Sequence, residues 1–111
     1  MIFPKYDENG RMVHNGARYN EIKRLAKMLD AHGVDYEMHE MSDGYQICVP
    51  SDHKPNSFDG DVIQHFASYG AEDDLLEVYG FGLDAPEGYL AAEEALPYFL
   101  KWEKEANIQC K

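Results

Sequence analysis

The sequence predicts an α+β fold of two layers, in which an antiparallel three-stranded meander carries helices on one face. Apolar side chains recur at helical spacing near both ends of the chain, and the segments between them alternate or are rich in β-branched residues. The length of 111 residues lies in the commonest range for one domain, about 100–150 residues. We therefore expect a single domain over residues 1–111, with the element order α-β-β-β-α-α.

Residues 1–15 are predicted to form an extended arm or a small hairpin. The hairpin reading rests on Asn9-Gly10, because a type I′ turn needs positive φ at both central residues. A helix over residues 17–32 follows, in which apolar residues recur at helical spacing and Lys23, Arg24 and Lys27 fall on the other face. Gly33 is a suitable C-terminal stop for this helix.

A hairpin and a third strand come next. Val34, Tyr36 and Met38 alternate with polar residues, residues 42–44 (Ser-Asp-Gly) supply a turn, and a second alternating segment ends at Pro50. Residues 61–66 are rich in β-branched and aromatic side chains, which favours a third strand.

Two helices are expected in the C-terminal half. Residues 71–79 carry three carboxylates at the start, which suits the first turn of a short helix. The last element is expected to start near Leu90, with residues 91–94 as a plausible first turn, and about residues 97–107 are helical in either reading of Pro97 below. Residues 106–111 are expected to fray. Pro97 costs about 3 kcal/mol deep inside a helix. The helix therefore either kinks there or begins with Pro97 at its first position.

The net charge of −11 is concentrated in the second half of the chain. Residues 1–55 hold seven basic and nine acidic side chains, whereas residues 56–111 hold three and twelve, and no Lys or Arg lies between Lys54 and Lys101. This pattern indicates either a solvated acidic face or a surface for a basic partner. The candidate partner-binding residues are Glu72, Asp73, Asp74, Glu77, Asp84 and Glu87.

The same composition excludes several classes of function. Anionic lipid and nucleic acid would repel so acidic a chain. The sequence shows neither a signal-peptide pattern at its start nor an apolar stretch long enough to span a membrane. Cys48 and Cys110 have no C-x-x-C spacing, and we interpret both as reduced thiols. A cytoplasmic location is therefore expected.

His65, Ser68 and Tyr69 are the candidates for a catalytic set, and Asp59, Asp61 and His65 are those for a metal site. Ser68 lies outside a G-x-S-x-G motif, and a serine at a turn more often caps or closes that turn. On one strand, Asp61 and His65 would lie about 13 Å apart at about 3.3 Å per residue, too far to share an ion without a bend. No cofactor is expected.

Three segments carry a resemblance to known proteins: residues 60–70 (GDVIQHFASYG), 74–80 (DLLEVYG) and 88–94 (GYLAAEE). Together they resemble small uncharacterised proteins of phages, prophages and mobile elements of Gram-positive and gut bacteria. Such proteins often have Thr at the position of Ala91, where it would open a capping box with Glu94. The resemblance covers the C-terminal half, implies a bacterial or phage gene acting in the cytoplasm, and brings no activity with it.

The sequence favours a non-enzymatic accessory protein that binds another protein through its acidic surface. One version is a nucleic-acid mimic that occupies the basic groove of a host factor. One alternative is a small hydrolytic or metal-dependent enzyme centred on His65. The other is a homo-oligomeric scaffold component.

Overall fold

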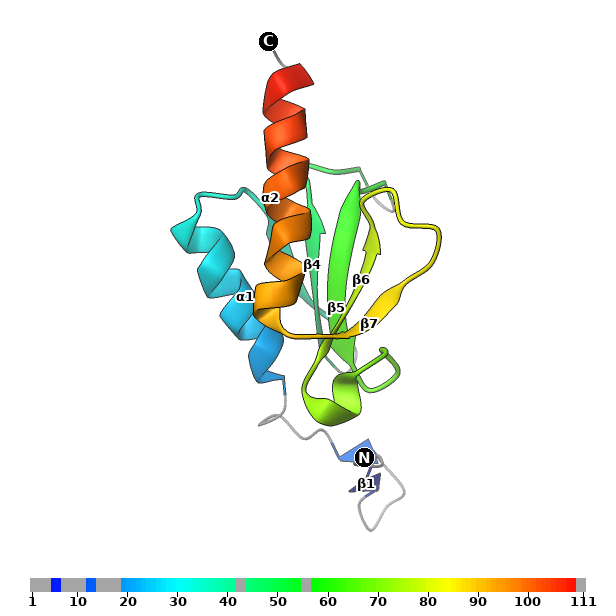
Figure 1. Ribbon diagram of the computed structural model, residues 1–111. Coiled ribbons are helices and arrows are strands. Elements are labelled where there is room, and N and C mark those ends of the chain that lie inside the picture. The colour runs from blue at the N-terminus through cyan, green and yellow to red at the C-terminus, as the bar shows by residue number, and fades with distance from the viewer. Residues whose placement is uncertain (1–4, 7–11, 14–18, 42–43, 55–56, 110–111) are drawn as a thin grey trace.

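The computed structural model describes residues 5–6, 12–13, 19–41, 44–54 and 57–109. Figure 1 shows two helices that lie together on one side of a sheet. The elements are, in order, β1 (Lys5–Tyr6), β2 (Met12–Val13), α1 (Asn20–Ala31), β3 (Glu37–Met41), β4 (Gly44–Val49), β5 (Gly60–His65), the 3₁₀ turn η2 (Ala71–Asp73), β6 (Leu76–Gly80), β7 (Glu87–Leu90) and α2 (Ala92–Gln109). The predicted α+β class is confirmed.

The sheet is an antiparallel meander of five strands, in the order β3-β4-β5-β6-β7. The expectation of three strands was therefore too low. Ile47 of β4 lies opposite Val62 of β5, which lies opposite Val78 of β6. These three residues are fully buried in the core beneath the helices. We call the opposite side of the sheet the outer face.

The prediction of a helix over residues 71–79 is wrong. Only the acidic start forms a helical turn, the 3₁₀ turn η2, which ends at Asp74 with φ of 56°. The residues that follow alternate, with Leu76 and Val78 buried and Tyr79 exposed. That period of two is the signature of a strand with one buried face.

Strand β7 was not predicted at all. It has four residues, includes Gly88, follows Pro86, and pairs with β6 through a register shift between Leu76 and Val78. Gly and Pro are both depleted in strands, so the local sequence hides this edge strand. It becomes a strand because β6 offers it a free edge.

The remaining strands differ from the prediction only at their ends. Strand β3 begins at Glu37, because the Val34 N–H donates to the Leu29 carbonyl over 3.0 Å and so still belongs to the end of α1. Strands β1 and β2 pair antiparallel, with Lys5 opposite Val13. Residues 9–10, the proposed turn of this hairpin, and residues 17–18 of the predicted first helix lie outside the described residues.

Helix α2 runs without interruption through Pro97, its sixth residue. Of the two alternatives, a helix that begins with Pro97 at its first position is therefore wrong, and a helix that starts earlier and includes Pro97 agrees with the structure. The backbone N–H of Ala91 donates to the Glu94 carboxylate over 3.0 Å, and that of Ala92 donates to Glu21 of α1 over 3.0 Å. These bonds hold the start of the helix a full turn before the proline. The helix reaches Gln109, so the tail expected from residue 106 is helical as far as that residue.

Neither helix in the described part of the chain combines the length and the apolar character that crossing a membrane requires. The apolar side of α1 (Ile22, Leu25, Ala26 and Leu29) and that of α2 (Ala92, Ala95 and Phe99) are both buried. Both helices therefore use their apolar positions to close one core over the sheet.

Candidate functional site

Ser68 closes the turn that follows β5. Its hydroxyl donates to the His65 carbonyl over 2.8 Å and accepts from the His65 N–H over 3.0 Å, and the residue is 5% exposed. The His65 imidazole accepts through Nδ1 from the Ala67 N–H over 2.9 Å. The Ser68 hydroxyl is therefore bonded to the backbone of His65 and not to its ring. This geometry matches a turn serine and gives the hydroxyl no base.

The three metal candidates point to different partners. Asp59 accepts a hydrogen bond from the Trp102 indole over 2.9 Å, and Asp61 accepts one from the Gln46 amide over 2.7 Å. His65 lies on the turn just described. Across the described residues, no group of three His, Cys, Asp or Glu side chains is arranged to hold a metal ion. The structure thus does not bring Asp59, Asp61 and His65 to one ion.

A buried acid–thiol pair lies under the outer face. Cys48 and Asp61 are cross-strand partners, and they are 0% and 8% exposed. Burial raises the pKa of the Cys48 thiol to about 12, and the Asp61 and Glu37 carboxylates add to this shift. Burial also raises the pKa of Asp61. A thiol with such a pKa is a poor nucleophile, because the thiolate is the reactive form.

The candidate partner-binding carboxylates do not share one role. Asp74 bonds to the backbone N–H groups of Asn20 and Glu21 at the start of α1. Glu87 accepts from the Tyr98 hydroxyl of α2. Asp73 of η2 and Asp84 of the β6–β7 loop are exposed. Part of the acidity is therefore used inside the fold.

Two of these carboxylates, Glu72 and Glu77, form a connected surface with tyrosines. The Tyr89 hydroxyl donates to Glu72, and the Tyr89 N–H donates to the Tyr69 carbonyl over 3.2 Å. The Tyr69 N–H in turn donates to Glu77 over 3.0 Å. Tyr79 lies two residues beyond Glu77 on β6, and thus on the same side of the strand. We call Tyr69, Glu72, Glu77, Tyr79 and Tyr89 the acidic–tyrosine surface.

The tyrosines of this surface are unusually open for large aromatic side chains. Tyr69 is 58% exposed, Tyr89 49% and Tyr79 46%. The close approach of β7 needs Gly88, because a Cβ there would lie 2.2 Å from the Tyr69 Cβ. The hydrogen bond from Tyr89 lowers the pKa of Glu72, so that this carboxylate stays charged. The surface therefore presents rings and negative charge together.

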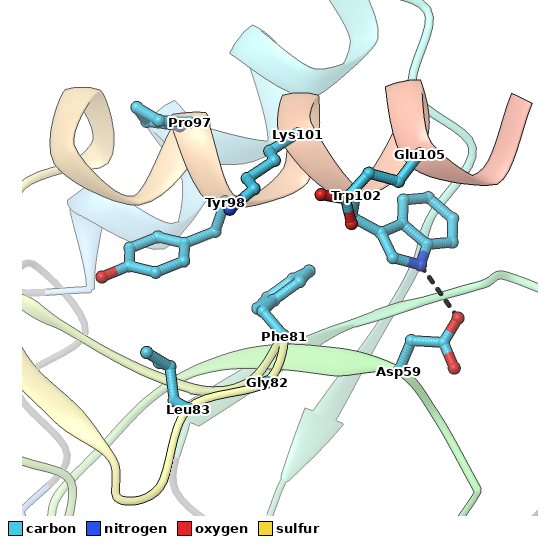
Figure 2. Close-up of a pocket in the computed structure, with 9 residues that line it drawn as sticks. All are labelled: Asp59, Phe81, Gly82, Leu83, Pro97, Tyr98, Lys101, Trp102 and Glu105. Atoms are coloured by element: carbon cyan, nitrogen blue, oxygen red, sulfur yellow. Dashed lines mark hydrogen bonds between the residues drawn. The ribbon is translucent and has the colours of Figure 1, made fainter. Parts of the chain in front are cut away.

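A second feature is a groove of about 530 Å³ between α2 and the β6–β7 loop (Figure 2). We call it the α2 groove. The indole of Trp102 lies at one end, where Nε1 donates to Asp59. Phe81 rises from the opposite wall, with its ring 5.9 Å from that of Tyr98 and 5.0 Å from that of Phe99. The lining residues are Asp59, Phe81, Gly82, Leu83, Pro97, Tyr98, Lys101, Trp102 and Glu105.

Sequence reasoning missed the α2 groove. In the sequence, Gly80-Phe81-Gly82 suggests an end to the preceding element, and a glycine pair that follows a helix does not suit a phosphate site; neither interpretation places Phe81 in a groove. Phe81 has φ of 53°, which is uncommon for a bulky residue. Its ring lies over Gly60, where a Cβ would come within 2.4 Å of it. Trp102, the single tryptophan, lies within the helix predicted over residues 97–107, and its position there gives no signal that it meets the β6–β7 loop.

Comparison with known proteins matched this chain to no family model, to no curated protein sequence and to no solved structure. The resemblance of the C-terminal half to phage and mobile-element proteins therefore stays a prediction. Any assignment of function must come from the side chains described above.

Proposed function

We propose that this chain is a protein-binding domain that engages a basic surface of another protein through the acidic–tyrosine surface. The observation that carries the proposal is the chain of contacts Glu72–Tyr89–Tyr69–Glu77, which keeps exposed rings beside charged carboxylates. Tyrosine is among the residues most enriched at the energetic centres of protein interfaces. Its ring face also attracts Arg and Lys cations. Rings and carboxylates together thus favour a basic protein as the partner.

One form of this proposal is a mimic of nucleic acid. A net charge of −11 steers the chain toward basic surfaces, and such attraction weakens with salt. A strongly basic patch or groove is characteristic of proteins that bind nucleic acid. The resemblance to phage and mobile-element proteins adds a bacterial cytoplasm as the setting. In this form, the partner is a nucleic-acid-binding protein of the host cell.

The enzyme alternative receives less support from the contacts. The Ser68 hydroxyl is bonded to backbone atoms, and the Tyr69 side chain is on the open acidic–tyrosine surface rather than in a cleft with His65. Self-association is the third alternative, and light scattering at several concentrations measures it. A rise in mass with concentration, abolished by Tyr89→Ser, would assign the surface to a second copy of the chain.

The proposal is tested with charge-matched variants. The first carries Glu72→Gln and Glu77→Gln, which keep the acceptors for the Tyr89 hydroxyl and the Tyr69 N–H while removing two charges. The control carries Glu40→Gln and Glu103→Gln, which remove two charges elsewhere. Proteins captured from bacterial lysate at low salt are quantified for both. We expect the first variant to lose about tenfold or more of the captured partner, and the control less than about twofold.

Two further results decide between the forms of the proposal. Competition by double-stranded DNA for the captured partner is expected of a nucleic-acid mimic, whereas a partner indifferent to DNA leaves only the basic-protein form. If both variants lose the same amount of partner, the attraction follows bulk charge and not this surface. In that case the capture is non-specific electrostatic attraction, and the proposal fails.

A further inference from the structure

The α2 groove is a second candidate binding site, and it shares no residue with the acidic–tyrosine surface. Its volume of about 530 Å³ lies within the range of ligand pockets, about 300–1,000 Å³. Along α2 it extends from Pro97 to Glu105, a distance of about 12 Å at 1.5 Å per residue. The groove is therefore longer than one side-chain head group and can take a neighbouring stretch of chain.

Three aromatic rings form the walls of the groove. Phe81 and Tyr98 lie with centroids 5.9 Å apart and planes at 37° to each other, and Trp102 completes the set at the far end (Figure 2). The face of an aromatic ring carries negative charge density, and tryptophan attracts cations most strongly. Such walls favour a cation over a neutral apolar guest.

The charged side chains of the groove also favour a cation. Asp59 and Glu105 supply two carboxylates against one ammonium, that of Lys101. In Figure 2 the Lys101 side chain extends toward Tyr98, whereas Asp59 lies on the other side of Phe81, beside Trp102. The bond from Trp102 Nε1 to Asp59 Oδ2 measures 2.9 Å. A carboxylate has about four acceptor positions, so Asp59 retains capacity for a further donor next to the indole.

We propose that the α2 groove binds the guanidinium group of an arginine side chain carried by another polypeptide. The guanidinium is planar, stacks on aromatic faces and offers a fork of N–H donors that matches a carboxylate. Trp102 supplies the face and Asp59 the acceptor, held in place by their own hydrogen bond. An anionic ligand is disfavoured, because two carboxylates line the groove and the chain as a whole is strongly acidic. The inference goes beyond the acidic–tyrosine surface and does not depend on it.

The single tryptophan makes the test direct, because all tryptophan fluorescence arises from Trp102. The full chain is titrated with N-acetyl-arginine amide, whose blocked ends imitate an arginine within a polypeptide. N-acetyl-citrulline amide, a neutral analogue of nearly the same shape, is the matched ligand. We expect a saturable change in emission with a Kd of about 1–10 mM for the arginine compound, and binding at least about tenfold weaker for the citrulline compound.

Variants locate the binding. Asp59→Asn keeps an acceptor for the Trp102 N–H and removes the charge, and we expect it to weaken binding of the arginine compound about fivefold or more. Glu40→Gln, an exposed carboxylate on β3, removes the same charge elsewhere and is expected to leave the Kd unchanged. The folding of Asp59→Asn is checked by its emission spectrum without ligand and by urea unfolding. If this variant does not fold, Glu105→Gln replaces it, and binding of the arginine compound is again expected to weaken.

Several outcomes would overturn the inference. Equal binding of the citrulline compound would make the groove a neutral apolar site. Equal binding of N-acetyl-lysine amide would remove the role of the planar guanidinium fork. The absence of any saturable change in emission would show that the groove does not bind the arginine compound. Free arginine is the last arm. If it binds about tenfold or more tightly than the blocked compound, the ligand is a free amino acid and not a polypeptide side chain.

Discussion

Gln64 of β5 donates a hydrogen bond from its side-chain amide to Asp74 Oδ1 over 2.8 Å, and the two side chains together cap the N-terminus of helix α1. Asp74 accepts from the backbone N–H of Asn20 over 3.0 Å and from that of Glu21 over 3.3 Å. Gln64 Oε1 accepts from the Ile22 N–H over 3.1 Å. The first four N–H groups of any helix lack partners within it. Here the sheet side of the fold supplies partners for three of them.

This arrangement replaces a local cap. The residue at the N-cap position is Tyr19, and no side-chain bond from it caps the helix. The capping groups instead come from residues more than forty positions away in sequence. Formation of α1 is thereby tied to formation of β5 and of the turn before β6. The assignment of Asp74 to partner binding is accordingly unsupported, since this carboxylate faces α1.

Replacement of Asp74 by alanine is therefore expected to destabilise the protein. Loss of a helix cap costs about 1 kcal/mol, and leaving the Gln64 amide without this acceptor adds a similar amount. We expect the free energy of unfolding, measured by urea titration, to fall by about 2 kcal/mol. Asp73→Ala is the control, since Asp73 is an exposed neighbour in the same turn. Equal losses for both variants would show that Asp74 does not act as a cap.

The residues around Asp74 also explain which elements could be predicted from the sequence and which could not. Helix α1 was predictable because its apolar face repeats along twelve local residues. Strand β6 was missed because Glu72, Asp73 and Asp74 resemble a helix start, and only the left-handed φ of Asp74 and the free edge of β5 decide otherwise. Tertiary pairing of this kind leaves no local signal.

The sites were harder to predict than the fold. Sequence reasoning named Tyr69, Glu72 and Glu77, but only the approach of β7 brings Tyr89 to them. The α2 groove depends on Phe81 and Trp102, which are 21 residues apart and line one groove because α2 lies on the sheet beside the β6–β7 loop. Sequence patterns report the period of an element and not which elements meet.

The contact between Gly60 and Phe81 gives a second prediction. A Cβ on residue 60 would lie 2.4 Å from the Phe81 ring, well inside van der Waals distance. Gly60→Ala is therefore expected to displace the ring and lower the free energy of unfolding by about 1–3 kcal/mol. Because the ring lines the α2 groove, the emission of Trp102 is expected to change as well.

A double-mutant cycle isolates that contact. In a Phe81→Ala background the ring is absent, so the further cost of Gly60→Ala is expected to fall below about 0.5 kcal/mol. Urea unfolding of the four proteins measures the coupling. An undiminished cost in the Phe81→Ala background would mean that residue 60 needs glycine for its backbone and not for the ring.

Asp61 gives a prediction about pH. Burial raises its pKa in the folded protein, so the folded state holds the proton more tightly than the unfolded state, whose pKa is about 3.9. Stability associated with this group is then fully present below pH 3.9 and is lost as pH rises through the folded pKa. Asp61→Asn removes the buried charge and keeps an oxygen for the Gln46 amide.

We expect Asp61→Asn to raise the free energy of unfolding at pH 7 by up to about 1 kcal/mol relative to the parent chain. The difference between the two proteins is expected to shrink as pH falls through the raised pKa of the parent carboxyl, because protonation removes its buried charge. Urea unfolding across this range measures it, with exposed Asp84→Asn as the control. A variant less stable than the parent at every pH would show that the charged hydrogen bond to Gln46 outweighs the cost of burial.

Cys48 provides the last prediction, because its thiol is fully buried and has a pKa of about 12. At pH 8 only about 10⁻⁴ of such a thiol is ionised, and the thiolate is the form that reacts. In a Cys110→Ser background Cys48 is the single cysteine. We expect alkylation of the native protein, followed by mass spectrometry, to proceed at least about a hundredfold more slowly than in urea. Because Cys48 lies on β4, which is paired on both sides by β3 and β5, the residual rate then reports opening of these three strands. Labelling as fast in the native protein as in urea would mean that Cys48 is accessible to solvent from the outer face. Asp61, its cross-strand partner, would then also be solvated, and burial would not raise its pKa.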